Sequence, residues 1–428
     1  MAKNMSFAPA ADLILGFSRG LEHRRLNFAR RIADTVMPDA WMRGHKPESP
    51  MDLPTLRMQT GDRPFSDQPA QSHTIPARFY LDRDIYDREK EAIFYRSWWF
   101  AGHKSQLDQP GRFITTRIHE QSIVVTRAVD GRLHAFYNVC QHRGHELVRG
   151  SGMSRLLVCP YHAWSYDLDG QLRKAPNTGD LVNFDKCAFS LKPVRVEEFC
   201  GLVFVNLDAD ASPFAEQAKG LEEELRHYCP GIDNLVYAHR SNYEIASNWK
   251  VVIDNFLECY HCRVAHRDFV DMVDMVSYKS EVRRIYSSHT SQAAQANSSA
   301  FKFEKGAVDF GYAAWYVWPN LTIWIYPGEA NLSTLQMLPD GPERTVEHLD
   351  WFLPSPEPSA QVRDAMRYMD EVLQPEDISL CESVQRGLHS RGYNQGRFVV
   401  DKALSHISEH AVHHFQQMVV NALGADLR

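Results

Sequence analysis

Two short segments carry the residue types of an iron–sulfur site. The first holds Cys140 and His142, and after sixteen further residues the second holds Cys159 and His162. A zinc finger usually takes two cysteines from one loop and two histidines from the other, whereas here each loop supplies one of each. Two cysteines on one iron and two histidines on the other are the ligands of a Rieske [2Fe–2S] centre. The spacing therefore predicts a Rieske cluster, and it disfavours a structural zinc ribbon.

The sequence around these ligands predicts the loops that a cluster needs. Residues 121–127 and 132–138 have the composition of strands on either side of the turn Asp130-Gly131. Asp169-Gly170 marks a second turn beyond the second ligand pair. We expect two hairpin tips to hold the cluster between them.

A second candidate metal site contains Glu258, His261 and His266, which follow an amphipathic helix that begins near Asn248. At about 100° per residue, Glu258 and His261 share a helix face, but His261 and His266 differ by about 140°. One regular helix cannot direct both histidines at one metal, so we predict that the chain unwinds or widens between them. Two histidines and one carboxylate form the facial triad of non-haem Fe(II) oxygenases.

The third ligand must come from elsewhere in the chain, and Asp377 is the best candidate. Pro375 predicts the start of a helix, which places Asp377 in the first turn. There its side chain points away from the apolar face, which is formed by Ile378, Val384 and Leu388. The adjacent Glu376 is the rival ligand.

Two other groups of potential ligands are expected to be structural. Cys259 and Cys262 flank His261, but without a second C-x-x-C they favour small buried side chains over a zinc knuckle. Four histidines near the C-terminus lie at helical spacing among apolar residues, which is typical of a packing helix: His406, His410, His413 and His414.

Composition excludes several classes of protein. The net charge of −7 argues against a nucleic-acid partner. The sequence contains no run of eighteen apolar residues, so no membrane span is predicted. Eight cysteines in 428 residues are sparse for a disulfide scaffold, so a reducing cytoplasm is the expected compartment.

The chain divides into three predicted parts. Residues 1–72 comprise an apolar, Arg-rich segment from Leu13 to Trp41, read as a docking helix or oligomer arm, and a linker from Lys46 to Ser72. Residues 73–210 contain a helix from Asp82 to Trp99 and a strand-rich cluster domain. Residues 211–428 begin with a helix from Phe214 to Tyr228 and mix helices and strands, so the fold class is α+β.

With both metal sites in view, the chain resembles the oxygenase (α) component of Rieske non-haem iron oxygenases from residue 74 onward. Several motifs are similar to those of the quaternary-ammonium branch, the carnitine, glycine-betaine and choline monooxygenases, and most of all to the carnitine enzymes. They lie at residues 74–80, 135–140, 159–164, 254–262, 374–377, 382–388, 407–410 and 414–415. Glu258 stands where ring-hydroxylating relatives usually carry Asp. The resemblance implies an all-β Rieske domain and a catalytic domain with a curved antiparallel, helix-grip-like sheet.

The resemblance also implies the cofactors and the assembly. A [2Fe–2S] cluster would receive single electrons from a separate flavin/[2Fe–2S] reductase that oxidises NAD(P)H, and Fe(II) would use O2. In a homotrimer the cluster of one protomer would face the iron of its neighbour. There His162 would donate its free N–H to Glu258 of the adjacent subunit, and Glu258 would contact His261.

Hydroxylation of a carbon next to the substrate nitrogen would give a product that collapses to an amine and an aldehyde. A small cationic substrate of this kind needs an aromatic surround. The hairpin from Tyr312 to Tyr326 is the candidate pocket wall, with five aromatic residues: Trp315, Tyr316, Trp318, Trp324 and Tyr326. Two alternatives remain, an aromatic-ring dioxygenase with the same metals and a Rieske electron carrier without oxygen chemistry.

Overall fold

The computed structural model describes residues 55–427, apart from 293, 305, 307, 309 and 310. The chain splits into two compact units, Met1–Leu53 and Pro54–Arg428, and the described residues belong to the second. The predicted N-terminal arm from Leu13 to Trp41 lies outside the described residues. Within the part that is described, no helix is long and apolar enough to cross a membrane.

The first sheet contains seven antiparallel strands in the order β1-β10-β9-β4-β3-β2-β5. Its strands are β1 Trp99–His103, β2 Arg112–Ile118, β3 Gln121–Arg127, β4 Leu133–Tyr137, β5 Ser151–Met153, β9 Pro193–Phe199 and β10 Leu202–Asn206. A small sheet beside it contains β6 Leu157–Val158, β7 Ser165–Tyr166 and β8 Leu172–Lys174. Both predicted hairpins are confirmed, because β3 pairs with β4 across Asp130-Gly131 and β7 pairs with β8 across Asp169-Gly170. Gly131, with φ of 79°, supplies the left-handed residue that the first turn requires.

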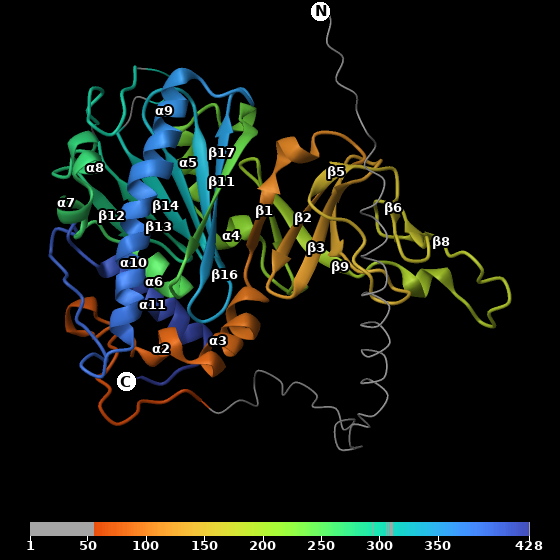
Figure 1. Cartoon of the computed structure of the whole chain (residues 1–428), viewed down its shortest axis with the longest axis horizontal. Coiled ribbons are helices and arrows are strands. Elements are labelled where there is room, and N and C mark those ends of the chain that lie inside the picture. Colours follow the sequence, from red (N-terminus) through yellow and green to blue (C-terminus); the bar gives the residue numbers. More distant parts are fainter. Residues whose placement is uncertain (1–54, 293, 305, 307, 309–310, 428) are drawn as a thin grey trace, which may run out of the picture. The chain divides into compact units, whose positions relative to one another are not determined.

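The second sheet is also antiparallel, with seven strands in the order β11-β17-β16-β15-β14-β13-β12. Its strands are β11 Val236–Ile245, β12 Lys279–Val282, β13 Tyr286–Thr290, β14 Ala313–Val317, β15 Leu321–Ile325, β16 Leu332–Pro339 and β17 Thr345–Leu353. The helices of this part are α6 Trp249–Phe256, α7 Cys262–Ala265, α8 Arg267–Met272, α9 Ala360–Tyr368, α10 Gln374–Leu388 and α11 His410–Ala422. Figure 1 shows α6, α10 and α11 gathered on one side of the sheet. The predicted α+β class is confirmed.

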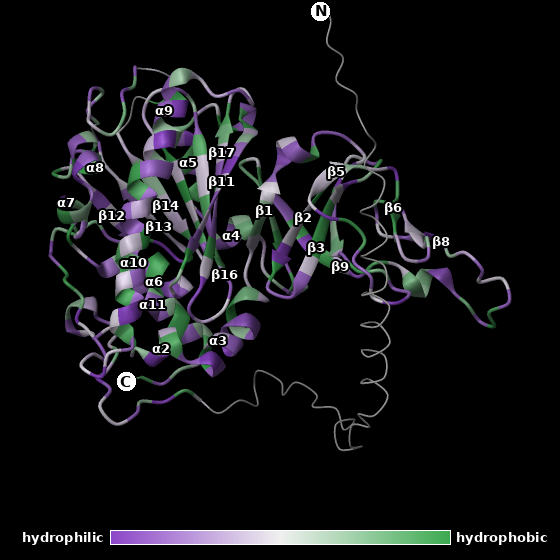
Figure 2. Cartoon of the chain, viewed as in Figure 1, coloured by the Kyte–Doolittle hydropathy of each residue, from purple (hydrophilic) through white to green (hydrophobic). Residues whose placement is uncertain are grey.

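Hydrophobic alternation explains how this sheet supports helices on one face and the short helices α4 Phe214–Gln217 and α5 Leu221–Tyr228 on the other. Tyr316 and Trp324 belong to the hydrophobic cluster beneath α6 and α11, whereas Trp315 and Ile323 belong to the cluster that contains α5. Successive strand residues point to opposite faces, so each strand serves both layers. The helices differ in the same property. Figure 2 shows that α6 carries a hydrophobic run, whereas α9 is largely hydrophilic.

The predicted helix from Asp82 to Trp99 is too long. The chain forms α2 Arg78–Leu81, α3 Arg83–Glu89 and a π-helical turn Lys90–Phe94, after which Trp99 begins β1. The N–H of Tyr95 donates to Lys90 and ends the helical run. The predicted helix Phe214–Tyr228 is likewise divided, into α4 and α5, by Gly220 with φ of 98°.

The helices α2 and α3, with the π-helical turn after them, pack against α6 and fix its position. Tyr80 Oη donates to Asp254 Oδ2 at 2.6 Å, and Lys250 Nζ meets Glu89 Oε1 at 2.5 Å in a fully buried ion pair. Phe94 contacts Trp249 with ring centroids 5.0 Å apart. These contacts hold in place the helix that leads into the candidate iron ligands.

The predicted linker from Lys46 to Ser72 is described from residue 55 onward, and residues 55–72 pack on the folded body. The N–H of Phe65 donates to the carbonyl of Leu427 at 2.8 Å, and Arg57 forms a β-bridge with Asp426. The Phe65 ring also stacks on His413 at 5.0 Å. Polar composition had suggested a linker, but pairing with the distant C-terminal end orders the segment.

Candidate iron centres

The four predicted cluster ligands lie in two adjacent loops. Cys140 and His142 follow β4, while Cys159 and His162 lie between β6 and β7. Both thiols are buried, at 2% and 3% exposure, and both imidazoles are exposed, with ring centroids 4.7 Å apart. The donor set therefore has a sulfur end inside the protein and a histidine end at the surface, as an asymmetric two-iron cluster requires.

The two loops repeat one hydrogen-bonding pattern. The N–H of Cys140 donates to the carbonyl five residues later, at 2.8 Å, and its own carbonyl accepts from Gly144 at 3.0 Å. Cys159 makes the equivalent bonds, again at 2.8 Å, and its carbonyl accepts from Ala163 at 3.0 Å. Gly144 and Ala163 both have φ above 50°, which closes each turn. The same local geometry thus presents both cysteine–histidine pairs.

Tyr166 contributes a polar contact to the sulfur end. Its hydroxyl lies 3.3 Å from Cys140 Sγ and accepts from the N–H of Gln141 at 2.9 Å. A cysteine that binds iron is a thiolate without a proton, so the Tyr166 hydroxyl would then be the donor to the sulfur. On the histidine side, Trp164 stacks on His142 with centroids 4.8 Å apart. Hydrogen bonds to the sulfurs are among the features that set the potential of such clusters.

The second site forms where the chain leaves α6. That helix ends at Phe256, α7 begins at Cys262, and His266 has φ of −118° and ψ of 70° between α7 and α8. The predicted break between the two histidines is wrong, because α7 lies between them as a regular helical turn. The N–H groups of Ala265 and His266 donate to the carbonyls of His261 and Cys262 at 3.0 and 2.8 Å. The chain instead departs from the helix before His261, where α6 has ended, and at His266.

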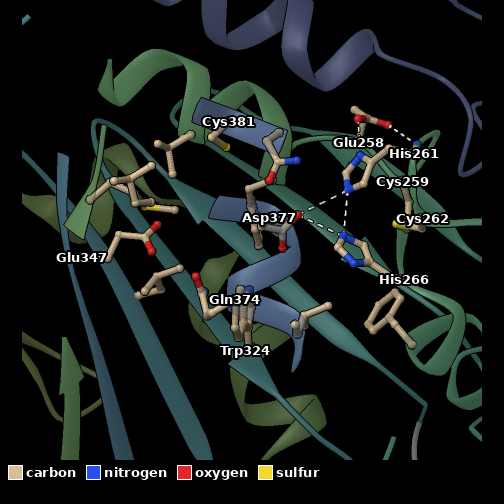
Figure 3. A pocket seen from close by; sticks show the side chains of 18 of the residues that line it. Glu258, Cys259, His261, Cys262, His266, Trp324, Glu347, Gln374, Asp377 and Cys381 are labelled. Atoms are coloured by element: carbon tan, nitrogen blue, oxygen red, sulfur yellow. Dashed lines mark hydrogen bonds and ion pairs between the residues drawn. A yellow bond between two sulfur atoms is a disulfide. The ribbon is translucent and has the colours of Figure 1, made fainter. Parts of the chain in front are cut away.

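Asp377 meets these histidines from α10. Its Oδ1 lies 3.0 Å from His266 Nε2 and 3.7 Å from His261 Nε2, and the two Nε2 atoms are 3.1 Å apart (Figure 3). One ligand atom from each residue lies within 4.8 Å of the others. Two imidazoles and one carboxylate converging in this way fit a ferrous ion with positions left for other ligands.

The outer nitrogens of both histidines face carboxylates. Glu258 Oε1 lies 2.5 Å from His261 Nδ1, and Glu376 Oε2 lies 2.8 Å from His266 Nδ1. Such contacts fix the tautomer and orientation of a metal-binding imidazole. Glu376 therefore occupies an orienting position, and the adjacent Asp377 occupies the position expected of the third ligand.

The charge at this site favours a cation. Burial alone would lower the pKa of His266, but the carboxylates of Asp377 and Glu376 raise it to about 9. Without a metal, a proton thus stabilises the gathered negative charge. A divalent ion at the same point would satisfy the same carboxylate.

The predicted start of α10 is confirmed, because Pro375 follows its first residue, Gln374, and Asp377 lies in its first turn. The segment before it was not predicted, since α9 runs into α10 through a π-helical turn, Met369–Leu373. The N–H of Gln374 donates to the carbonyl of Met369, five residues back. Proline has no N–H to donate, and the wider turn before it lets the helix continue.

A cavity extends from the triad, and only one of the five predicted aromatic residues lines it. Trp324 does, stacked on Phe256 at 5.8 Å. Trp315 lies on the opposite face of the sheet, where its Nε1 donates to Glu224. Three others fill the core around the cavity: Tyr316, Trp318 and Tyr326. Alternation along the hairpin determines which face of the sheet each side chain lies on, but the curvature of the sheet determines which side chains reach the cavity.

Other lining residues were not among the predicted site residues. Further aromatic walls come from Phe256, Phe269, Tyr278 and Tyr312. A buried acid, Glu347, also lines the cavity from β17. The sequence did hold a signal for it, because Glu347 is in phase with the apolar Leu349 and Trp351.

The two cysteines beside His261 form a disulfide, Cys259–Cys262. They are buried, as predicted, but they are paired rather than free. Of the four C-terminal histidines, three lie on the packing helix α11 as predicted: His410, His413 and His414. His410 Nε2 lies 3.0 Å from the carbonyl of Ser280, and His413 Nε2 lies 2.7 Å from that of Ser66. His406 lies before this helix, where its Nε2 accepts from Arg263 Nε at 3.2 Å.

Comparison with known proteins finds a family match for each of the two parts of the chain. Residues 97–185 match the model of the Rieske [2Fe-2S] domain, and residues 232–425 match that of the ring hydroxylating alpha subunit (catalytic domain). The oxygenase subunit of carnitine monooxygenase from Acinetobacter baumannii is 39% identical over 359 residues, which are 83% of this chain and 96% of that protein. Choline monooxygenase from Beta vulgaris is 31% identical over 356 residues, 81% of this chain and 76% of that protein.

Solved structures extend the comparison. A quaternary ammonium Rieske monooxygenase in complex with L-carnitine superposes with a TM-score of 0.77 at 37% identity, over 84% of this chain and 99% of that one. Naphthalene 1,2-dioxygenase from Rhodococcus shares the fold, with a TM-score of 0.71 at 19% identity, over 82% and 94% of the two chains. A Rieske domain joined to this catalytic domain implies a [2Fe–2S] cluster, a mononuclear iron and O2 as co-substrate. The chain belongs to the oxygenase (alpha) subunits of the Rieske non-haem iron oxygenases, in their quaternary-ammonium branch.

Proposed function

We propose that this chain is the oxygenase component of a monooxygenase that hydroxylates a carbon next to the nitrogen of an N-methylated quaternary ammonium compound. Carnitine, glycine betaine and choline are the candidate substrates, since the relatives at 31–40% identity are carnitine and choline monooxygenases. The observation that carries the proposal is the cavity that joins the His261, His266 and Asp377 triad to aromatic walls. Aromatic faces attract a quaternary ammonium group, which offers no N–H for hydrogen bonding.

The side chains have separate roles in this proposal. Cys140, His142, Cys159 and His162 hold the cluster, and His261, His266 and Asp377 hold the iron. When bound, these groups supply one-electron transfer and activation of O2. The aromatic walls bind the cationic head and exclude water, while Glu258 orients His261 through its Nδ1.

The remaining partners belong to the same proposal. A separate flavin/[2Fe–2S] reductase would deliver electrons from NAD(P)H. The exposed histidine end of the cluster suits transfer to the iron of a neighbouring protomer in a homotrimer, with Glu258 between them. In Figure 1, β6 and β8 lie at the opposite edge of the described unit from α7 and α8, so transfer within one chain would span the body of the protein. A cytoplasmic location stays a prediction, which fractionation of the native cells would test.

Turnover by anaerobically purified, iron-loaded protein with a surrogate reductase tests this function. NADH- and O2-dependent products would be followed by mass spectrometry over carnitine, γ-butyrobetaine, glycine betaine, choline and several aromatic acids. Trimethylamine, a demethylated product or formaldehyde from one quaternary compound supports the proposal. Turnover of an aromatic acid alone contradicts it and favours the dioxygenase alternative. The electron-carrier alternative leaves the catalytic domain at residues 232–425 without a role.

A further inference from the structure

Glu347 is a buried acid without a protein partner. It is 1% exposed, and among the described residues no hydrogen-bond donor reaches its Oε2. A buried carboxyl is costly unless it is paired, and buried polar atoms in native proteins nearly always have partners. The exception therefore calls for an explanation, and the position of the residue offers one.

The side chain of Glu347 lies in the wall of the cavity that contains the triad. It comes from β17, opposite Met337 on β16, which lines the same cavity. Figure 3 shows the two histidines on one side of Asp377 and Glu347 on the other, with Trp324 and Gln374 nearby. A molecule held in this cavity would thus meet the metal ligands at one end and the free carboxyl at the other.

The charges of the cavity wall are one-sided. In the described lining there are three acids, Glu258, Glu347 and Asp377, and neither lysine nor arginine. Glu258 is engaged by His261, and Asp377 faces the metal position. Glu347 is the acid that remains without a partner, so a bound cation could pair with its carboxylate.

We propose that Glu347 is the specificity-determining counter-charge for the ammonium head of the substrate, an inference that rests on the proposed function. A quaternary nitrogen cannot donate a hydrogen bond, so the attraction is Coulombic. It gains strength because Glu347 is only 1% exposed, which places its carboxyl in a region of lower dielectric constant. The aromatic faces of Trp324 and its neighbours accept the methyl groups, and Glu347 selects for the charge.

The titration of Glu347 is consistent with this role. Burial, reinforced by Asp377, raises the pKa of Glu347 to about 8. Other ionisable groups that interact with it are Cys381 on α10 and Tyr243 on β11. A neighbouring cation favours the ionised carboxyl, so cation binding should release a proton near neutral pH.

A charge-matched binding experiment tests the inference. The affinities of carnitine, glycine betaine and choline would be measured by titration of full-length protein with both iron centres. The titrations would be anaerobic, because turnover needs O2. The neutral carbon isostere of choline, 3,3-dimethylbutan-1-ol, serves as the shape control. The Glu347→Gln variant should bind the cations more weakly by roughly tenfold or more, yet bind the alcohol as the wild type does. The affinity of Glu347→Asp for the cations should lie between those of the wild type and Glu347→Gln, because it keeps the charge on a shorter side chain.

The controls separate a local role from a general one. Glu244→Gln removes an equal charge from an exposed position on β11 and should leave every affinity unchanged. Equal losses for choline and the alcohol in Glu347→Gln would mean a structural role and overturn the inference. Unchanged cation affinity in that variant would also overturn it, while leaving the proposed function intact. A wild type that binds no quaternary ammonium compound would refute both.

Discussion

Removal of the Glu376 carboxylate should weaken iron binding without removing a ligand. Glu376 Oε2 contacts His266 Nδ1 at 2.8 Å, on the ring edge opposite Asp377. Partners that orient a metal-binding histidine in this way typically contribute 10- to 100-fold to metal affinity. Glu376→Ala should therefore lower the affinity for iron by about 10- to 100-fold, or roughly 1.4–2.7 kcal/mol. Glu376→Gln keeps an acceptor and should lose less.

Asp377→Ala provides the contrast, because it removes a ligand and should leave the mononuclear site without iron after purification. Iron per chain would be measured in a chelator competition, with the visible absorbance and EPR signal of the Rieske cluster as the internal reference. Glu371→Gln is the matched control, since Glu371 is exposed in the π-helical turn just before α10. If Glu376→Ala empties the site while Asp377→Ala retains iron, the assigned roles of the two carboxylates are reversed. Wild-type affinity in Glu376→Ala would refute the orienting role.

Three other perturbations have defined outcomes. Tyr166→Phe removes a hydrogen bond of about 0.5–1.5 kcal/mol from a cluster sulfur, which should lower the Rieske potential by roughly 20–65 mV in an EPR-monitored titration with an unchanged signal intensity. Replacing Cys259 and Cys262 together by serine opens a four-residue loop and should lower the free energy of unfolding by about 2 kcal/mol, and wild-type protein in a phosphine reductant should fall to the same value. Glu347 has its pKa raised from 4.5 to about 8 by burial and by Asp377, so between these values the unfolded chain has ionised and the folded chain has not. The free energy of unfolding should therefore fall as the pH rises between these two values. Glu347→Gln should reduce the difference in Tm between pH 5 and pH 8, and an unchanged difference would contradict the claim that burial raises the pKa of Glu347.

Local sequence was sufficient for the parts of the site that depend on short spacing. Cys140 and His142 lie in one turn, so their joint presentation follows from residue types and a glycine nearby. Helix geometry correctly indicated that Glu258, His261 and His266 do not lie on one regular helix, although the chain departs from the helix before His261 and at His266 and not between them. The strands beside the cluster were predictable for the same reason, because their turns are encoded by Asp-Gly pairs.

Long-range packing decided what the sequence left open. Residues 55–72 look like a linker until Phe65 meets Leu427, more than 350 positions away. The sequence of the aromatic hairpin β14–β15 predicts which side chains share a face of the sheet, but not which of them the curvature of the sheet brings to the cavity. Trp324, which lines the cavity, could therefore not be distinguished from Tyr316, which lies in the core. Cys259 and Cys262 are at a spacing that permits a zinc ligand pair, buried thiols or a disulfide, and the helix break that brings them together was needed to choose.

The choice between Glu376 and Asp377 illustrates why adjacent residues are the hardest case. They differ by about 100° around α10, and the phase of that helix is set by the π-helical turn Met369–Leu373. A π-helical turn adds one residue to the helix, so every residue after it is displaced by one position relative to a regular continuation of α9. In that regular continuation Glu376 would point where Asp377 points now. A single-residue deletion within the turn removes the added residue, so a regular helix should then keep Asp377 directed at the two Nε2 atoms. Iron binding that still depends on Asp377 in the deletion variant would support the turn as the determinant of the helix phase, and loss of iron binding would refute it.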